Sequence, residues 1–553
     1  MKRLVTSLVS AAALWTAACS GGGSTIPPPP PAGKFTLASL KGTYAFVTNG
    51  EVCAGASCTP TPLARTGSFT SDGAGNIMAN SVYDLVNFDG SGTAAAPIPI
   101  TGGKYTMNSD GRGTLTLDVN SGALASSLLF GIVLTSGSSG TTPASDGLMI
   151  DETSPTTTNT NQASTGSGNF VLQNTAAFQI STITGPYVFD FTGLDGNSGG
   201  PFPVSVVGQF NANGTGQITG GVEDANDDFT LLSNGVIGAG TVTPDPTNLA
   251  TSGRGTATIA GQDFAFYIVD SGRVRLISIN AAGTGPMLNG DAVQQANTIP
   301  ASLGAINSSF VFLVAGAAGD TGGGLIRVGR FTANGASPLT KMFMDQNDAT
   351  VHGVFNGLNN GLITSYDAST GRGVFSFNDS SGNTYSFVFY LSSANAGVIQ
   401  DASVGNVTAA VADGSILVQS GSPFTSSNIS GAYGLNWSGV VTNRGAGIQD
   451  EEDLVSQVKV SSLSLTGTSD IFQFSSSSAL MPNTNVGTTG QINFNNGDGT
   501  NGDGNRVSMA VNLSATSQIH MVVYIANPQL AFFANSDNNG TERIIAGILK
   551  AQQ

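Results

Sequence analysis

A pattern of alternating apolar residues opens four similar segments of the chain. In each segment an aliphatic residue and a small residue precede aromatic or aliphatic side chains at every second position. The segments are residues 40–46, 183–189, 306–312 and 429–435. A period of two is that of a β-strand with one buried face. The pattern predicts four copies of one β-rich module.

A second recurring feature closes each module. A glycine is followed five residues later by glutamine in four places: Gly168/Gln173, Gly290/Gln295, Gly414/Gln419 and Gly547/Gln552. The opening strands and these closing pairs predict β-modules over 37–173, 178–295, 302–419 and 424–553. For the residues that precede them we expect a signal peptide over 1–18 and an anchor and tether over 19–36. Few residues separate each closing glutamine from the next opening strand. We therefore expect modules strung head to tail by short linkers.

The first module contains eight candidate strands. They lie near residues 43–48, 66–70, 76–83, 102–107, 114–119, 127–134, 148–151 and 169–172. Most of the connections are short and rich in Gly, Asn, Asp or Ser, as antiparallel hairpins require. Eight sequential strands fit a small up-and-down barrel, which closes and leaves no free edges. We predict an all-β fold of four antiparallel barrels, with β-sandwiches as the alternative.

The opening strand of the first module reads Gly42-Thr43-Tyr44-Ala45-Phe46. This Gly-x-Tyr-x-Phe strand resembles the first strand of lipocalin- and avidin-type barrels. Lipocalins carry tryptophan where Tyr44 stands, and the resemblance covers one strand per module. It implies a barrel, and no ligand site is carried over from it.

A Gly-Arg-Gly turn recurs in three modules, with Arg112, Arg254 and Arg372 at its centre. In each of these modules an earlier strand ends at an acidic residue: Asp84, Asp224 and Asp345. We interpret the six residues as structural ion pairs that join neighbouring turns at one end of each barrel. A repeated binding site is the alternative interpretation.

The fourth module departs from this pattern. Residues 448–455, with four acids in succession, replace the first hairpin and suggest a short acidic helix. Residues 495–505 form an expanded turn rich in Asn, Asp and Gly. Asp498 and Asp503 in that turn are weak candidates for calcium ligands, because calcium prefers several oxygens on a tight turn. The turn lacks the final Glu of an EF-hand loop, and we expect no other cofactor.

The N-terminus has the features of an export signal. Lys2 and Arg3 precede an apolar run over residues 4–14, and Thr16-Ala17-Ala18-Cys19 follows. This segment resembles the lipobox of bacterial lipoproteins, although Thr16 stands where leucine is usual. The resemblance implies cleavage before Cys19, lipid attachment to its sulfur and, through Ser20, export to the outer membrane. A secretory signal with a chance cysteine is the alternative.

The segment after Cys19 suits a tether. Glycines at 21–23 are followed by five prolines at 27–31, a composition that favours a flexible and then an extended chain. Two cysteines remain, Cys53 and Cys58, and an even pair in an exported protein predicts a disulfide. We expect the protein to face the periplasm or the cell exterior.

Charge and composition narrow the range of possible functions. The formal charge of −16 leaves no basic face for phosphates, so we expect no nucleic-acid partner. A hydrophobic content of 40% argues against disorder. The chain has two histidines, His352 and His520, in different modules, and no Gly-x-Ser-x-Gly elbow leads from an expected strand into a helix. We predict no catalytic residues and no enzymatic activity.

These features lead to one expected function and two alternatives. We expect a lipid-anchored envelope protein that acts as a non-enzymatic surface scaffold or an adhesive, interaction array. Its partners would be the membrane, through the lipid, and an unknown protein or surface. A binding protein that holds a small apolar ligand inside its barrels is the first alternative. A hydrolase is the second and less favoured one.

Overall fold

The computed structural model of the chain is all-β and contains four modules, as predicted. It describes residues 35–54, 60–87, 96–119, 127–137, 142–154, 162–195, 202–280, 285–319, 323–348, 352–355, 358–405, 407–443, 448–474, 480–494, 505–514, 517–537 and 542–553. The predicted signal peptide, Cys19 and the tether lie outside the described residues.

The first two modules are closed antiparallel barrels. The strands of the first module are β1 (Lys41–Ala54), β2 (Thr61–Asp72), β3 (Asn76–Ile77), β4 (Ser81–Asn87), β5 (Ile98–Tyr105), β6 (Arg112–Val119), β7 (Ser127–Leu134), β8 (Asp146–Asp151) and β9 (Gln162–Leu172). Those of the second are β10 (Thr184–Asp195), β11 (Phe202–Asn213), β12 (Gln217–Asp227), β13 (Thr230–Ile237), β14 (Gly240–Pro244), β15 (Arg254–Ile259), β16 (Gln262–Asp270), β17 (Arg273–Ser278) and β18 (Met287–Gln294). In each barrel the first strand pairs with both the second and the last strand.

The last two modules differ in closure. The third contains β19 (Ser309–Ala318), β20 (Gly324–Thr332), β21 (Thr340–Asp348), β22 (His352–Phe355), β23 (Asn359–Asp367), β24 (Arg372–Asn378), β25 (Thr384–Ser393), β26 (Ala396–Asp401) and β27 (Ala410–Val418). The fourth contains β28 (Gly431–Asn443), β29 (Ile448–Ser461), β30 (Ser464–Phe474), β31 (Leu480–Asn493), β32 (Arg506–Ser514), β33 (Ser517–Asn527), β34 (Leu530–Asn535) and β35 (Glu542–Ala551). The fourth barrel closes, whereas β22 and β23 end the third sheet without pairing to each other among the described residues.

The predicted acidic helix at residues 448–455 is wrong, because this segment begins β29, which pairs with β28 from Ile448 onward. Acidic side chains there do not face water. Glu451, Glu452 and Asp453 are all buried. Pairing along the whole strand, with neighbours on both faces, outweighs the preference of these residues for an exposed helix.

Aromatic side chains from the alternating strands fill the barrel interiors. In the first barrel the ring of Tyr44 stacks on that of Phe69 at 5.4 Å and meets Phe170 edge to face at 5.6 Å. The equivalent pair in the second barrel, Tyr187 and Phe210, stacks at 5.5 Å. The period of two in the sequence therefore gives one packed core per module.

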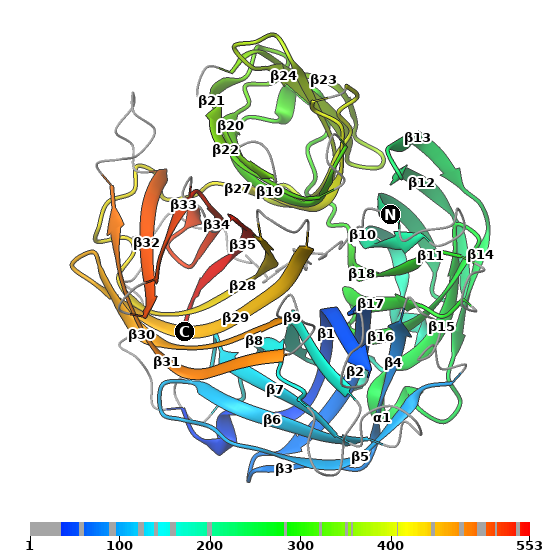
Figure 1. Cartoon of the computed structure of the whole chain (residues 1–553). Coiled ribbons are helices and arrows are strands. Elements are labelled where there is room, and N and C mark those ends of the chain that lie inside the picture. Colours follow the sequence, from blue (N-terminus) through cyan, green and yellow to red (C-terminus); the bar gives the residue numbers. More distant parts are fainter. Residues whose placement is uncertain are drawn as a thin grey trace.

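The four modules form a closed ring rather than an extended string (Figure 1). Each module packs against its successor in the chain, and the fourth packs against the first through β28 and β29 on β8 and β9. Apolar clusters lie across these joints; one of them contains Val133, Val311 and Val522 from the first, third and fourth modules. The modules follow one another through short linkers, as expected, and they also pack on one another because the barrels carry apolar residues on their outer faces.

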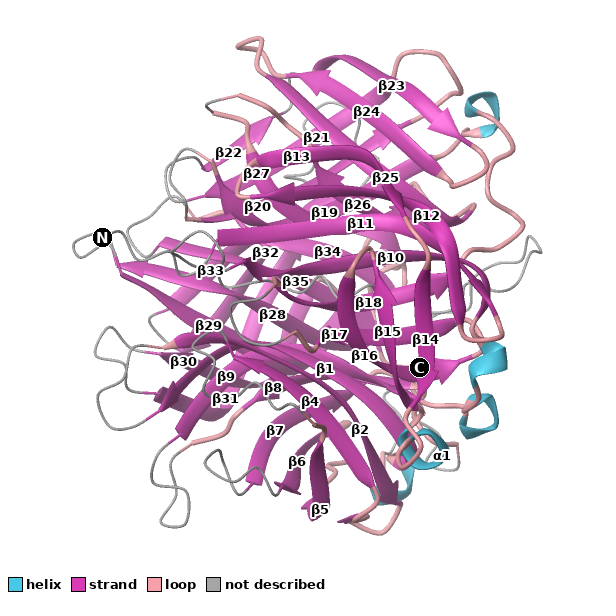
Figure 2. Cartoon of the chain, turned by 90° about the vertical axis from the view of Figure 1, so that its right-hand side faces the viewer, coloured by secondary structure: helices cyan, strands magenta, loops and turns pink. Residues whose placement is uncertain are grey.

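One end of the barrels carries the short helices. These are η1 (Leu37–Ser39), which precedes β1, and η2 (Thr175–Ala177), η3 (Ile180–Thr182), α1 (Leu249–Ser252) and η4 (Leu303–Ala305), which connect strands. Figure 2 shows them together along one side of the molecule. We call this side the helical face; the Gly-Arg-Gly turns also lie there. No helix among the described residues is long and apolar enough to cross a membrane.

Candidate functional site

The recurring arginines and aspartates meet at the joints between modules. Arg254 of the second module donates from Nε and Nη2 to the two carboxylate oxygens of Asp84 of the first, each at 2.8 Å. The hydroxyl of Tyr267 donates to the same carboxylate at 2.6 Å. We call this arrangement of an arginine, an aspartate of the preceding module and a tyrosine a clamp.

The same clamp holds the next two joints. At the second to third joint, Arg372 donates twice to Asp224 at 2.7 Å and Tyr390 donates at 2.6 Å. At the third to fourth joint, the corresponding residues are Arg506, Asp345 and Tyr524, with distances of 2.8, 2.6 and 2.5 Å. Planar guanidinium and carboxylate groups joined by two parallel hydrogen bonds give the most directional of the common ion pairs.

Local strand geometry explains why arginine and tyrosine converge. The arginine is the first residue of its strand, and antiparallel pairing places a tyrosine directly opposite: Arg254 with Tyr267, Arg372 with Tyr390 and Arg506 with Tyr524. Side chains of directly opposed residues lie on the same face of the sheet. Both therefore leave the barrel on its outer face and reach the same aspartate.

The clamps are buried, and burial together with the hydrogen bonds fixes the protonation states of their arginine and tyrosine. The side chains of Arg254 and Asp84 are 7% and 3% exposed. Burial and the negative charge of Asp84 raise the pKa of Tyr267 well above its ordinary value. Burial alone would lower the pKa of Arg254, but the hydrogen bonds and the charge of Asp84 outweigh it and raise this pKa. Tyrosine stays protonated and arginine stays charged, so the clamp has no group poised to transfer a proton.

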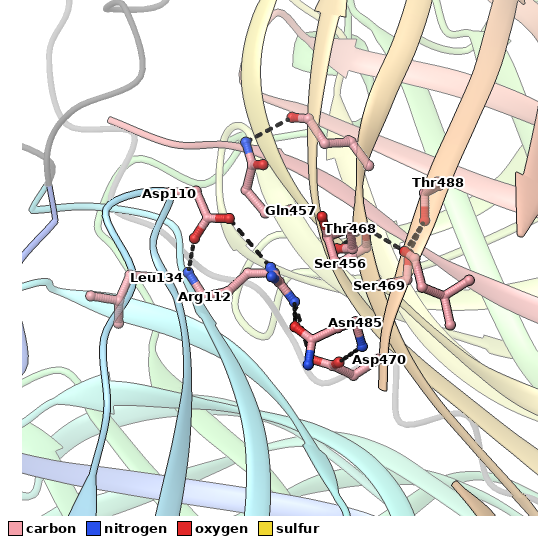
Figure 3. Close-up of polar contacts among 12 residues, drawn as sticks. Asp110, Arg112, Leu134, Ser456, Gln457, Thr468, Ser469, Asp470, Asn485 and Thr488 are labelled. Atoms are coloured by element: carbon pink, nitrogen blue, oxygen red, sulfur yellow. Dashed lines mark hydrogen bonds and ion pairs between the residues drawn. The ribbon is translucent and has the colours of Figure 1, made fainter. Parts of the chain in front are cut away.

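The fourth joint, which closes the ring, carries a modified clamp (Figure 3). Arg112 of the first module lies 3.6 Å from Oδ2 of Asp470 of the fourth and donates to Oδ1 of Asn485 at 3.2 Å. It also contacts Asp110 of its own turn at 3.3 Å. Val133 stands opposite Arg112, where the other clamps have tyrosine.

The closing glutamines form a second set of contacts across every joint. The side-chain amide of each donates to backbone carbonyls beside the arginine turn of the neighbouring module. Gln173 reaches Ser252 and Ile268, Gln295 reaches Thr370 and Leu391, Gln419 reaches Ile525, and Gln552 reaches Asp110 and Leu134. The last of these joins the C-terminus to the first module, which closes the ring.

The pairing within one module that we expected for Arg112, Arg254, Arg372, Asp84, Asp224 and Asp345 is wrong. Each arginine binds an aspartate of another module, because the Arg-Gly turn and the acidic strand point outward toward adjacent barrels. Asp470, Arg506 and the three tyrosines were not predicted as site residues from the sequence. Arg506 directly follows the expanded turn of the fourth module, and this position was the signal for it.

A cleft opens on the helical face where the first, second and fourth modules meet. Its volume is about 550 Å³, and its lining includes Asp146, Asn169, Asp270, Arg273, Gln529 and Lys550. Nζ of Lys550 lies 2.7 Å from Oδ1 of Asp146. Burial alone would raise the pKa of Asp146, but the charge of Lys550 and the side-chain hydrogen bonds to this carboxylate together outweigh it and hold the pKa below its ordinary value. Arg273 is likewise paired with Asp291. These cations are already neutralised by carboxylates of the chain.

The other predicted sites have separate outcomes. Cys53 is disulfide-bonded, and its expected partner Cys58 lies outside the described residues. Asp498 and Asp503 also lie outside them. Within the part of the chain that is described, no cluster of three or more His, Cys, Asp or Glu residues could hold a metal ion. Nδ1 of His520 lies 2.5 Å from Asp537, and no described serine or threonine hydroxyl bonds to this ring.

Comparisons with known proteins add little. No protein-family model and no curated protein sequence matches the chain. Two solved structures of Transferrin Binding Protein B from Haemophilus parasuis Hp5, the Trp-176-Ala mutant and the Tyr-167-Ala and Trp-176-Ala double mutant, are 10% and 11% identical to it. They overlap 73% and 76% of this chain and 83% and 86% of their own, with TM-scores of 0.19 and 0.16. Superpositions this weak bear on neither the fold nor the function of the protein.

Proposed function

We propose that this protein is a lipid-anchored component of the bacterial cell envelope that acts as a non-enzymatic scaffold or interaction array. The anchor rests on the sequence: the basic start, the apolar run over residues 4–14 and Cys19 after small residues. The scaffold rests on the way the ring is joined.

One observation carries the proposal: the recurring acids and bases hold barrels together and do not line a cavity. In the three clamps every aspartate accepts from both an arginine and a tyrosine of the next module. These aspartates are buried, and the hydrogen bonds they accept come from within the protein, so they act as structural contacts and are not presented to a ligand. The repetition that organises the sequence is thus explained by assembly of a rigid platform.

The alternative of a ligand inside the barrels finds less support. Aromatic rings occupy the positions that a ligand would need; Phe312, Phe331 and Phe375 of the third barrel, for example, lie within 6.4 Å of one another. The hydrolase alternative lacks a nucleophile beside His520 in the described part of the chain. We therefore retain the scaffold as the proposed function.

The position of Phe35 gives the platform an orientation. The backbone N–H of Phe35 donates to the carbonyl of Ser109 at 3.3 Å, next to the turn of Arg112. The described chain therefore starts on the helical face. An anchor at Cys19 would hold this face toward the membrane, and the opposite barrel ends would face outward as the interaction surface.

Cell fractionation of a Cys19→Ser variant tests the anchor. We expect the wild type in the membrane fraction, labelled by a fatty-acid analogue, and the variant unlabelled and released. Membrane association and labelling that persist in the variant would overturn the proposal. A fluorophosphonate probe, which labels nucleophilic serines, should leave both proteins unlabelled, and labelling would favour the hydrolase.

A further inference from the structure

Two carboxyl groups face each other across the joint between the second and third modules. Asp190 lies in β10, three residues after the opening aromatic Tyr187, and Asp413 lies in β27, six residues before the closing Gln419. They are 8% and 3% exposed. Neither belongs to the clamp at this joint, which consists of Arg372, Asp224 and Tyr390.

The two carboxyl groups form a hydrogen bond with each other. Thr192 also bonds to Asp413. Oδ1 of Asp190 and Oδ2 of Asp413 receive no hydrogen bond from any other described residue. An ionised carboxylate only accepts hydrogen bonds, so this contact requires a proton on one of the two groups.

The surroundings supply no cation to replace that proton. On β18 the residue opposite Asp190 is Asp291, a further acid, whose carboxylate pairs with Arg273 and lies 3.6 Å from Arg275 of β17. On the other side, β19 and β26 place Ala315 and Gln400 opposite Asp413, and β11 places Val207 opposite Asp190.

Other charges and amides near this joint are engaged elsewhere. Gln400 donates to Ser205 of the second module at 2.6 Å. Asp401, which follows it, is paired with Arg327. The carboxyl pair therefore has only its shared proton to reduce its charge.

We propose that Asp190 and Asp413 share a proton and act as a pH-sensitive lock between the second and third modules. With the proton in place, the carboxyl groups attract and hold β10 against β27. Without it, two buried carboxylates repel each other across the joint, which then loosens.

The titration of the pair agrees with this geometry. Burial, followed by the charge of Asp413, raises the pKa of Asp190 well above its ordinary value, and burial raises the pKa of Asp413 to about 7. A carboxyl whose pKa is raised on folding stabilises the folded state fully below its unfolded pKa of 3.8. That stabilisation is lost as the pH rises through the folded values. The lock is therefore strongest in mild acid, and its contribution to stability declines as the pH rises from 3.8 toward the folded pKa values.

At two other joints the position equivalent to Asp413 holds an uncharged residue with an uncharged partner, so the facing pair of acids distinguishes this joint from those two. Six residues before the closing glutamine stand Asn289 and Ser167; Asn289 donates to Asn49 across the first to second joint. Ser167 donates to Asn436 across the joint that closes the ring. Asn436 occupies the position of Asp190, three residues after an opening aromatic. The same fold thus accepts an amide there.

The Asp190→Asn variant of the full protein tests the lock, because its amide donates to Asp413 without a titrating proton. Denaturant unfolding would be measured from pH 4 to pH 9. We expect the unfolding equilibrium constant of the wild type to rise about tenfold more per pH unit than that of the variant, over the range up to about pH 7. Asp118→Asn, which removes an exposed acid on β6, is the matched control and should keep the wild-type slope.

Equal slopes for the wild type and Asp190→Asn would overturn the proposal. Should Asp190→Asn fail to fold, infrared spectroscopy of the wild type decides the question. A protonated carboxyl band that persists at pH 6 and disappears by pH 9 supports the shared proton. A spectrum without that band at pH 6 rejects it.

Discussion

The joint that closes the ring differs from the three joints between successive modules. Each successive joint is held by a clamp with two short arginine bonds and a tyrosine. The closing joint has one longer contact between Arg112 and Asp470, and valine in place of tyrosine. Successive modules are joined by short linkers, whereas the closing joint must bring together residues 442 positions apart.

The closing joint compensates with a wider spread of polar contacts. Lys550 pairs with Asp146, Thr165 donates to Asp453 at 2.7 Å, and the backbone N–H of Gln553 donates to the carbonyl of Thr135. Several moderate contacts replace one strong unit.

The largest effect is expected from Arg254→Ala. The change leaves Asp84 buried with a tyrosine as its remaining partner, and removing one member of a buried ion pair costs about 3–5 kcal/mol of the free energy of unfolding. Arg112→Ala should cost about 1–2 kcal/mol, because its contact with Asp470 is long, at 3.6 Å. Denaturant unfolding of both variants checks the order. Equal losses would remove the distinction between the two kinds of joint.

The second effect is a gain in stability at the closing joint. Glu152 is buried near Asp470; burial first, then the charges of Asp470 and Asp151, raise its pKa from 4.5 to about 8. A raised pKa means that stability is complete below pH 4.5 and declines as the pH rises toward 8.

Glu152→Gln should remove this decline, because an amide does not ionise. Folding raises the pKa of Glu152 from 4.5 to about 8, and one pH unit corresponds to about 1.4 kcal/mol. The variant should therefore exceed the wild type by about 4 kcal/mol near pH 8 and match it near pH 4. Thermal unfolding across this pH range is the measurement. Parallel curves for the two proteins would contradict a proton on Glu152.

The fold was predictable where alternation marks one buried face. Tyr44 and Phe46 fix the face of β1, and the Gly-Arg-Gly turn marks the start of β6. The ring was harder to predict, because the residues on the outer face of a barrel strand can be as apolar as those that point into the barrel core. Strand β7 reads Ser-Leu-Leu-Phe-Gly-Ile-Val-Leu, and both of its faces are buried: Phe130 lies in the barrel core, and Val133 lies against other modules. A strand that is apolar on both faces indicates a second packing layer.

Most of the arginines and aspartates of the clamps could be predicted from the sequence, but their partners could not. Recurrence identified the arginines and aspartates, but distance along the chain favoured partners within a module. A contact such as Arg372 to Asp224 spans 148 positions and depends on how two barrels meet. In the fourth module, the acids after Gln449 resemble a solvated segment, and only pairing of β29 with its neighbours explains why Asp453 is buried.

The third-largest effect on stability is expected when the tyrosine hydroxyl is removed from a clamp, which then has, like the closing joint, no tyrosine donor. Tyr267→Phe removes the hydroxyl that donates to Asp84 and leaves the arginine bonds intact. A hydrogen bond to a charged group contributes about 1.5 kcal/mol or more. Tyr105→Phe is the control, since that hydroxyl donates to the uncharged carbonyl of Leu37 and should matter less. A larger loss in the control would show that the tyrosine is not part of the clamp.

The smallest effect is expected from Gln552→Ala, and it separates loss of closure from loss of fold. The variant loses two donated hydrogen bonds, to the carbonyls of Asp110 and Leu134, of which the first is only partly buried. It also loses one long bond of 3.4 Å that Oε1 accepts from Gln457. We expect a loss of about 1 kcal/mol, since water can replace part of what is removed. Gln173→Ala should cost more, because both of its carbonyl partners are buried and it also accepts from Ser68.

Adding Arg112→Ala to Gln552→Ala should open the ring and leave the barrels folded, because three joints would still hold successive modules together. Small-angle scattering should then show a radius of gyration above the compact value of about 24 Å, with an unchanged circular dichroism spectrum. A double variant that stays compact would place closure in the contacts of Lys550 and Thr165. A double variant that unfolds would mean that the closing joint, and not the clamps, sustains the modules.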